Sequence, residues 1–308
     1  MDKRKIIRIV LFCLFAVIFC VAGYNLIKVK LEYRENEQIY SDAVDQFLIY
    51  TPTEPPTTQV TTTSVPTTPP TTATTTQTSA TSVSSTAPGE VTTTSETTTV
   101  PPETTTETST EATTAATEPI PTYPNFTLDW AALKAANPDI VAWIWQSGTT
   151  INYPVLKSDT NDEYLYTTYN YKYSRLGSIF LDWRSSLDRA NPVIYGHNAG
   201  NGMMFATLVK YRGWEYFNQN RYFYIITENG VEKYAVFSAY KVKTSSDTYT
   251  FQFDSDTSYA AYLEKIRLRS AYNMGVSVSP TDHIVTLSTC TNTGEEDRYV
   301  VHAKRIEG

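Results

Sequence analysis

Two neighbouring runs near the C-terminus decide how this chain folds: HIVTLSTCT at 283–291 and DRYVVHAKRI at 297–306. Both are rich in β-branched and aromatic residues, and polar residues separate them. Short runs of this composition, bounded by turn residues, are typical of β-strands. The sequence therefore predicts two strands here, with Cys290 near the end of the first and Arg298 at the start of the second.

Six further runs of the same kind lie upstream, which indicates a fold built mainly from β-strands. They occupy 140–145, 151–155, 178–183, 191–197, 221–227 and 231–244. Helical spacing of apolar residues marks three short segments. These lie near 128–136, at 202–211 and at 258–270. Many short strands with few scattered helices favour a β-barrel or sandwich over a doubly wound sheet.

The N-terminus carries a long apolar run, with no charged residue from 9 to 27. That length matches a helix that crosses a bilayer. Basic residues within 3–8 precede the run, which predicts a cytoplasmic N-terminus and an outward-facing remainder. A cleaved signal peptide has a shorter apolar core and a small-residue cleavage site, whereas KVK at 28–30 follows this run. The pattern therefore favours an uncleaved anchor.

A Thr-dominated tract follows, without Lys, Arg or His from 51 to 124. Such a segment buries too little apolar surface to offset its ordering entropy, so we expect an extended, disordered stalk, with O-glycosylation as an option. We expect this stalk to hold the folded domain away from the membrane. The expected parts are a basic N-terminus (1–8), a transmembrane anchor (9–27), a juxtamembrane segment (28–50), the stalk (51–124) and a folded domain (125–308).

Composition excludes some classes of function. The formal net charge of the 308 residues is −7, which argues against a nucleic-acid partner, because neutralising phosphates needs clustered Lys and Arg. Of three cysteines, Cys13 and Cys20 lie in the apolar run, so Cys290 has no partner for a disulfide within the folded domain. It is either an inert buried thiol or a reactive one. No ligand spacing suggests a metal site, and no cofactor is implied.

A reactive Cys290 needs a base, and the chain offers three histidines. His197 ends the apolar run NPVIYGH and opens a Gly- and Asn-rich loop, which places its imidazole at a rim. His283 stands seven residues before Cys290 in one strand, roughly 20 Å away if the strand is straight. His302 lies mid-strand, as a satisfied strand histidine or a supporting group. His197 is therefore the preferred base.

A cation is the third candidate group, because an acyl-transfer intermediate develops an oxyanion. If the two C-terminal strands pair as a hairpin, Arg298 lies near the same rim as Cys290. The alternative is a solvated edge arginine, the commoner fate of a lone Arg. Arg267 and Arg305 are weaker candidates, on a predicted helix face and further along the chain.

These motifs resemble the sortase family. VTLSTCT at 285–291 resembles its TLxTC signature, with Ser288 at the free position. DRYVVHAKR at 297–305 is similar to the family's last strand, which an Arg opens, and NPVIYGHNAG at 191–200 is similar to the strand and loop that carry the catalytic His. The segments at 137–155 and 173–186, together with the helices, resemble the class B branch. The resemblance covers about 125–308.

The resemblance implies a mostly β fold: a closed eight-stranded β-barrel with an N-terminal helix and a helix inserted before the Cys-bearing strand. It implies an extracellular transpeptidase that cleaves a C-terminal sorting signal of secreted proteins through a thioester on Cys290. An amine, commonly from a peptidoglycan precursor, then takes the acyl group, while some members join pilin subunits instead. His197 serves as acid and base and Arg298 stabilises the oxyanion. Substrate-binding roles are implied more weakly for Ser288, Thr289 and Asn198.

Two other readings stay open on the residues alone. An extracellular cysteine peptidase would use the same Cys and His with water as the final nucleophile, releasing surface proteins by hydrolysis. A non-catalytic surface module on a stalk would keep Cys290 buried and inert.

Overall fold

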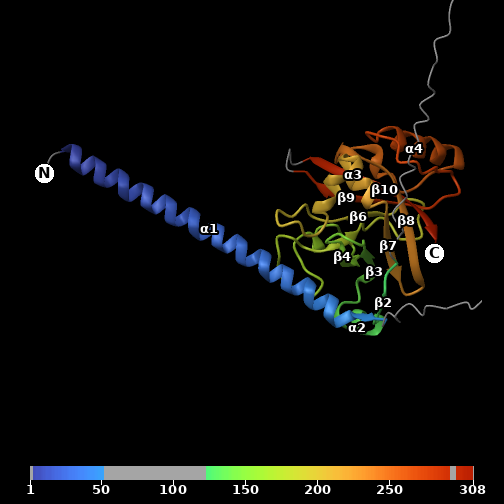
Figure 1. Ribbon diagram of the computed structural model, residues 1–308, viewed down its shortest axis with the longest axis horizontal. Helices are drawn as coiled ribbons and strands as arrows, with labels where there is room; N and C mark the ends of the chain where they lie inside the picture. The colour runs from blue at the N-terminus through green and yellow to red at the C-terminus, as the bar shows by residue number, and fades with distance from the viewer. Residues whose placement is uncertain (1–2, 52–122, 292–295, 308) are drawn as a thin grey trace, which may run out of the picture. The chain divides into compact units, whose positions relative to one another are not determined.

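A closed barrel of eight strands forms the centre of the computed structural model, which describes residues 3–51, 123–291 and 296–307 (Figure 1). The strands are β3 (Ile140–Trp145), β4 (Asn152–Leu156), β5 (Ile179–Leu181), β6 (Val193–Tyr195), β7 (Tyr222–Thr227), β8 (Gly230–Lys243), β9 (Ile284–Cys290) and β10 (Asp297–Glu307). Their order around the barrel is β10-β8-β7-β3-β4-β5-β6-β9. Two of the pairings, β4 with β5 and β6 with β9, are parallel. The predicted mostly β fold is confirmed.

Two of the three short helices of the described barrel domain, α2 (Trp130–Ala136) and α4 (Asp256–Leu268), lie where helices were expected, and α3 (Trp214–Gln219) was not predicted. The 3-10 turns are η1 (Glu163–Leu165), η2 (Ala206–Arg212) and η3 (Asp247–Tyr249). The helix expected at 258–270 is α4, and a capping box formed by Ser255 and Ser258 stabilises its N-terminus. Its buried face packs over strands β8 and β10 through Leu263 and Ile266. The helix expected at 202–211 is a 3-10 turn instead.

The N-terminal helix α1 (Lys3–Phe47) is one continuous helix, and its N-terminal part is long and apolar enough to cross a membrane. Its C-terminal part belongs to the folded core, because the buried residues Asn36, Tyr40, Ala43 and Phe47 recur at helical spacing. Tyr40 donates a hydrogen bond from its hydroxyl to the carbonyl oxygen of Gly177 at 2.6 Å. The folded unit therefore extends beyond the 125–308 range expected from sequence.

A short antiparallel pair joins the two ends of the Thr/Pro tract. Strand β1 (Leu48–Tyr50) pairs with β2 (Phe126–Leu128), and the Thr51 amide donates to the Asn125 carbonyl at 2.9 Å. Most of the tract lies outside the described residues. The C-terminal part of α1 itself packs against the barrel, so the two are joined by this packing as well as by the tract. The expectation of a stalk at 51–124 stays a prediction, because nearly all of that segment lies outside the described residues.

One glycine sets the path of the chain where β6 ends. A Cβ atom at Gly196 would lie 2.3 Å from the Ile179 side chain and 2.8 Å from the Phe205 ring, so only glycine fits between them. The Gly196 amide continues the pairing with β9 by donating to the Ser288 carbonyl at 3.1 Å. The chain can therefore follow β9 for one more residue before it turns into the loop that begins at His197.

Candidate active site

Strand register brings the three sequence-predicted residues to one rim of the barrel. In the parallel pair of β6 and β9, Tyr195 lies opposite Ser288. His197 lies two residues after Tyr195, and Cys290 lies two residues after Ser288, so both come at the same end of this strand pair. In the antiparallel pair of β9 and β10, Arg298 lies directly opposite Cys290. The ends of three adjacent strands thus supply an imidazole, a thiol and a guanidinium.

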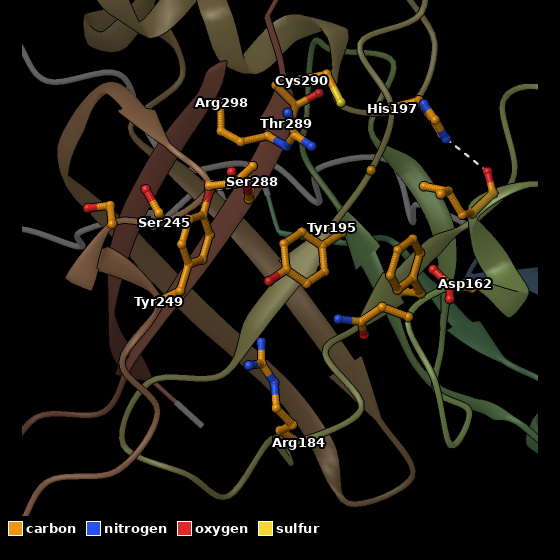
Figure 2. A pocket seen from close by; sticks show the side chains of 16 residues that line it. Asp162, Arg184, Tyr195, His197, Ser245, Tyr249, Ser288, Thr289, Cys290 and Arg298 are labelled. Atoms are coloured by element: carbon orange, nitrogen blue, oxygen red, sulfur yellow. Dashed lines mark hydrogen bonds between the residues drawn. The ribbon is translucent and has the colours of Figure 1, made fainter. Parts of the chain in front are cut away.

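The three side chains line one cleft of about 440 Å³ (Figure 2). In this view the Cys290 sulfur projects from the end of β9 toward the side where His197 lies. Cys290 is half-buried and is not in a disulfide, so its thiol meets the cleft and solvent. The other side chains that shape the cleft include Asn161, Arg184, Tyr195, Tyr249, Ser288 and Thr289.

His197 is held by a backbone carbonyl. Its Nε2 atom lies 2.8 Å from the carbonyl oxygen of Leu165. A carbonyl only accepts hydrogen bonds, so Nε2 carries the proton, and Nδ1 holds the lone pair of the neutral imidazole. Burial lowers the pKa of His197, the hydrogen bond to Leu165 opposes this, and the positive charge of Arg298 lowers the pKa further. The imidazole is therefore neutral near pH 7 and able to accept a proton.

The start of β10, which carries Arg298, is fixed by ion pairs. The buried carboxylate of Asp297 contacts Lys241 at 2.6 Å and Lys243 at 2.5 Å, and both lysines lie on the neighbouring strand β8. The Arg298 Nη1 atom donates to the Asp297 carbonyl at 3.1 Å. These contacts restrain the strand end, which keeps the guanidinium close to Cys290.

The floor of the cleft is a layer of hydroxyl groups over a buried carboxylate. The hydroxyls of Tyr249 and Ser288 lie 3.0 Å apart. Tyr195 donates at 3.0 Å to Asp182, which also accepts two hydrogen bonds from Arg184 at 2.9 and 2.8 Å. Burial raises the pKa of Asp182, but these hydrogen bonds outweigh it and the net pKa is lowered, so the carboxylate stays ionised.

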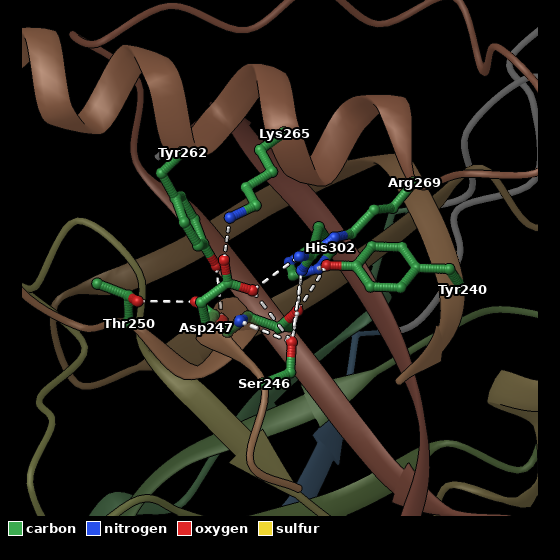
Figure 3. A network of polar contacts seen from close by, with 9 residues as sticks. Tyr240, Ser246, Asp247, Thr250, Tyr262, Lys265, Arg269 and His302 are labelled. Carbon is green, nitrogen blue, oxygen red and sulfur yellow. Dashed lines mark hydrogen bonds and ion pairs between the residues drawn. The ribbon is translucent and has the colours of Figure 1, made fainter. Parts of the chain in front are cut away.

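The other candidate residues lie elsewhere. His302 is fully buried between the hydroxyls of Thr286, at 2.8 Å, and Tyr240, at 3.0 Å. Figure 3 shows His302 beside Tyr240. Burial lowers the pKa of His302 to about 3. His283 lines a separate hollow next to α4, and it is half-buried rather than on the open surface. Arg267 pairs with Glu264 and Arg305 with Glu232, both outside the cleft.

The fold and this cleft match a known family: a family model described as the sortase domain matches residues 147–306. The chain belongs to the sortase family. It is a sortase-type cysteine transpeptidase, and its similarity is to class B members. Sortase B of Staphylococcus aureus (strain NCTC 8325 / PS 47) is 37% identical over 177 residues, which are 57% of this chain and 70% of that protein. Sortase B of Listeria monocytogenes serovar 1/2a (strain ATCC BAA-679 / EGD-e) is 37% identical over 181 residues, 56% of this chain and 72% of that protein.

Solved structures agree with the family match. A Staphylococcus aureus sortase B–substrate complex superposes with a TM-score of 0.55 at 36% identity, covering 57% of this chain and 84% of that one. Clostridium perfringens sortase B superposes with a TM-score of 0.55 at 34% identity, covering 57% of this chain and 99% of that one.

Within this sortase, sequence reasoning placed some cleft residues and missed others. Besides the three at the rim, Ser288 and Thr289 line the cleft as expected. Asn198 is not among the lining residues, and its backbone pairs with Met204 instead. The missed contributions are the Leu165 carbonyl, the Tyr249 hydroxyl and the pair of Asp182 with Arg184. A backbone carbonyl has no side-chain signature, whereas a buried acidic residue beside an Arg in SIFLDWRSS was a readable signal.

Proposed function

We propose that this chain is a membrane-anchored transpeptidase in which Cys290 is the nucleophile, His197 the acid and base, and Arg298 the oxyanion stabiliser. The observation that carries the proposal is the shared register of β6, β9 and β10, which supports a common site for these three residues at one rim. Sorting signals of secreted proteins are the proposed acyl donors, and an amine of the cell wall is the proposed acceptor.

In the first half-reaction, the Cys290 sulfur attacks the carbonyl carbon of the scissile amide after His197 has taken the thiol proton. The lowered pKa of His197 favours the neutral imidazole that this step needs. The C–N bond breaks, the leaving amine takes the proton from the imidazolium, and a thioester remains on Cys290. Arg298, opposite Cys290, stabilises the oxyanion of the tetrahedral intermediate.

In the second half-reaction, an amine attacks the thioester carbon and the C–S bond breaks. His197 takes the proton from the attacking nitrogen, and the sulfur leaves as a thiolate that is reprotonated. The product is a new amide, so the two half-reactions exchange one amide bond for another without any oxidant or reductant. A similar sortase B has been solved in a complex with triglycine, a peptide with a free amine, which supports an amine acceptor here.

The proposed location is the outer face of a cell membrane, with the basic N-terminus in the cytoplasm. The apolar part of α1 crosses the bilayer in this proposal, and the folded unit lies outside. We propose the catalytic domain as 125–308 completed by the C-terminal part of α1, because Tyr40 and Phe47 are buried in its core.

The test uses the full chain in detergent, since α1 completes the core. The chain is incubated with fluorogenic sorting peptides, with and without an amine, beside Cys290→Ala. We expect cleavage that disappears in Cys290→Ala and an amide-linked product when the amine is present. Cleavage that gives only the acid would replace the transpeptidase proposal by hydrolysis. If no peptide is cut and Cys290 resists alkylation, the proposal fails.

A further inference from the structure

A tyrosine-rich loop lies beside the membrane helix. The tyrosine loop, residues 166–175 with the sequence YTTYNYKYSR, contains four tyrosines. One of them, Tyr169, is buried and packs against Phe47 of α1 at a ring distance of 5.8 Å. The other three point outward, with exposures of 47% for Tyr166, 56% for Tyr171 and 76% for Tyr173. The loop is thus fixed to α1 on one side and presents aromatic rings to its surroundings on the other.

Backbone hydrogen bonds within the loop hold it in a defined turn. The Thr168 amide donates to the Lys172 carbonyl at 2.9 Å, and the Tyr171 amide donates to the Thr168 carbonyl at 3.0 Å. Tyr171 adopts a φ of 61°, in the left-handed region that bulky residues rarely occupy. The turn therefore holds the Tyr171 ring outward at a cost in backbone strain.

The loop reaches α1 where the apolar run ends. Arg175 contacts Glu32 twice, through its backbone amide at 3.1 Å and its side chain at 3.4 Å. A groove of about 540 Å³ separates the helix from the loop, and Tyr173 lines it together with Tyr24 and Ile27. Because Tyr24 and Ile27 belong to the apolar run, the exposed ring of Tyr173 stands at the level of the membrane-spanning residues.

Helix geometry places this contact inside the lipid headgroup layer. From Ile27 to Glu32 the helix rises by roughly 7–8 Å, at about 1.5 Å per residue. The headgroup region on one side of a bilayer is about 5–8 Å thick, from a total of about 40–45 Å around a core of about 30 Å. Tilting of α1 toward the loop brings it nearer the hydrocarbon. Tyrosine is enriched at this depth because its ring is apolar and its hydroxyl is polar.

The charges around the groove suit a phosphate-bearing surface. Lys28 and Lys30 follow the apolar run on α1, and Lys172 lies between the two most exposed tyrosines of the loop. Long basic side chains extend toward lipid phosphates while their stems cover apolar surface. Two acidic residues, Glu32 and Glu35, line the groove further along α1, and Glu32 is paired with Arg175.

We propose that the tyrosine loop is a second membrane contact, docked in the headgroup layer of the same bilayer that α1 crosses. This proposal rests on the proposed membrane anchor. Tyr166 stacks on Tyr173 at 6.5 Å and lies 5.9 Å from the His197 ring. The His197 side of the cleft therefore faces the bilayer surface, and substrates held at that surface reach it directly.

The experiment measures the depth of a tryptophan in the full chain, reconstituted in vesicles of phosphatidylcholine and phosphatidylglycerol. Tyr173→Trp is compared with the parent chain, whose five tryptophans are present in both, so the difference in emission reports position 173. Lipids brominated near the glycerol end of the acyl chain serve as quenchers. Tyr50→Trp is the matched control, because Tyr50 is 54% exposed and lies past the far end of α1. Tyr171→Trp is a second reporter in case one variant fails to fold.

We expect brominated lipids to quench the added emission at 173 and 171 severalfold more than at 50. Equal quenching at all three positions, or none at 173 and 171, would overturn the proposal. Amine-dependent peptide transfer in detergent needs no bilayer, so intact transfer without quenching rejects the membrane contact alone. Loss of transfer points to the proposed chemistry instead, and failure of the chain to float with vesicles removes both the anchor and the contact.

Discussion

Two of the three histidines, His302 and His197, differ in how the fold engages their ring nitrogens. His302 lies inside the barrel with a partner on each ring nitrogen, Thr286 and Tyr240. His197 sits at a strand end, where a carbonyl fixes Nε2 and the ring lines the cleft (Figure 2). Burial lowers the pKa of both, and most strongly for His302. What distinguishes the two is therefore how their nitrogens are engaged, not the direction of the pKa shift.

The hydrogen bonds around His302 can be assigned one by one. Thr286 donates its hydroxyl proton to the Asn191 side-chain oxygen at 2.7 Å, so it must accept from His302 Nδ1. Nε2 then accepts from the Tyr240 hydroxyl. Both ring nitrogens of His302 are therefore engaged in hydrogen bonds, so its imidazole has no nitrogen available to exchange a proton. The comparison indicates that a histidine suits acid–base chemistry when one of its ring nitrogens is not engaged by the fold.

The largest expected effect comes from matched substitutions of the two histidines. We expect His197→Gln to lower kcat/KM for amine-dependent transfer by about 10²–10⁴, the usual contribution of a general acid–base group. His302→Gln keeps a donor and an acceptor and leaves transfer within severalfold of the parent. Peptide-transfer kinetics on both variants check this. Equal losses in the two variants would remove the distinction between the histidines.

The next effect is on stability against pH. His302 has a pKa of about 3 when folded against 6.5 when unfolded, so the unfolded chain binds more protons between these values. The contribution of His302 to stability is therefore present above pH 6.5 and is lost as the pH falls toward 3, by roughly 2.5 kcal/mol between pH 6 and pH 4. Urea unfolding in detergent at both pH values measures it. His302→Gln should lose this dependence, and an unchanged dependence would assign it to other groups.

Much of this fold could be predicted from the sequence. The strand bounds agree to within a few residues, because turn residues flank β-branched runs such as IVAWIW at 140–145. The rim of the cleft was predictable because its three residues stand at strand ends. The docking of α1 was missed because the stripe of Asn36, Tyr40, Ala43 and Phe47 is diluted by charged residues. Strands β1 and β2 have three residues each, too few to show a period.

A smaller effect separates two threonines of β9. Thr286 is bonded to His302 and Asn191, whereas the buried Thr289 hydroxyl has no partner among the described residues. Thr286→Val leaves two buried polar atoms unpaired, and we expect a loss of about 1–3 kcal/mol in the free energy of unfolding. Thr289→Val removes an unpaired hydroxyl and should cost nothing. Chemical unfolding of both variants at pH 7 checks the difference, and equal costs would contradict the hydrogen-bond assignment.

The smallest effect concerns the pKa of His197 itself. Burial is the main cause of its lowered pKa, and the charge of Arg298 adds to it. In a Cys290→Ala background, Arg298→Gln should raise the His197 pKa, while Arg267→Gln, on α4 and paired with Glu264, should leave it unchanged. NMR titration of the imidazole resonances measures both. A His197 pKa that does not move with Arg298→Gln would place the guanidinium too far from the ring to act on it.

The pairing of β1 with β2 bears on what happens when the chain is cut. Because both strands belong to the same folded unit as the end of α1, we expect a cut between 52 and 122 to break the polypeptide without separating the two pieces. Helix α1 stays attached through the buried face that includes Tyr40 and Phe47. Because α1 is held to the barrel by noncovalent packing as well as by the backbone, we expect the two to stay together after such a cut.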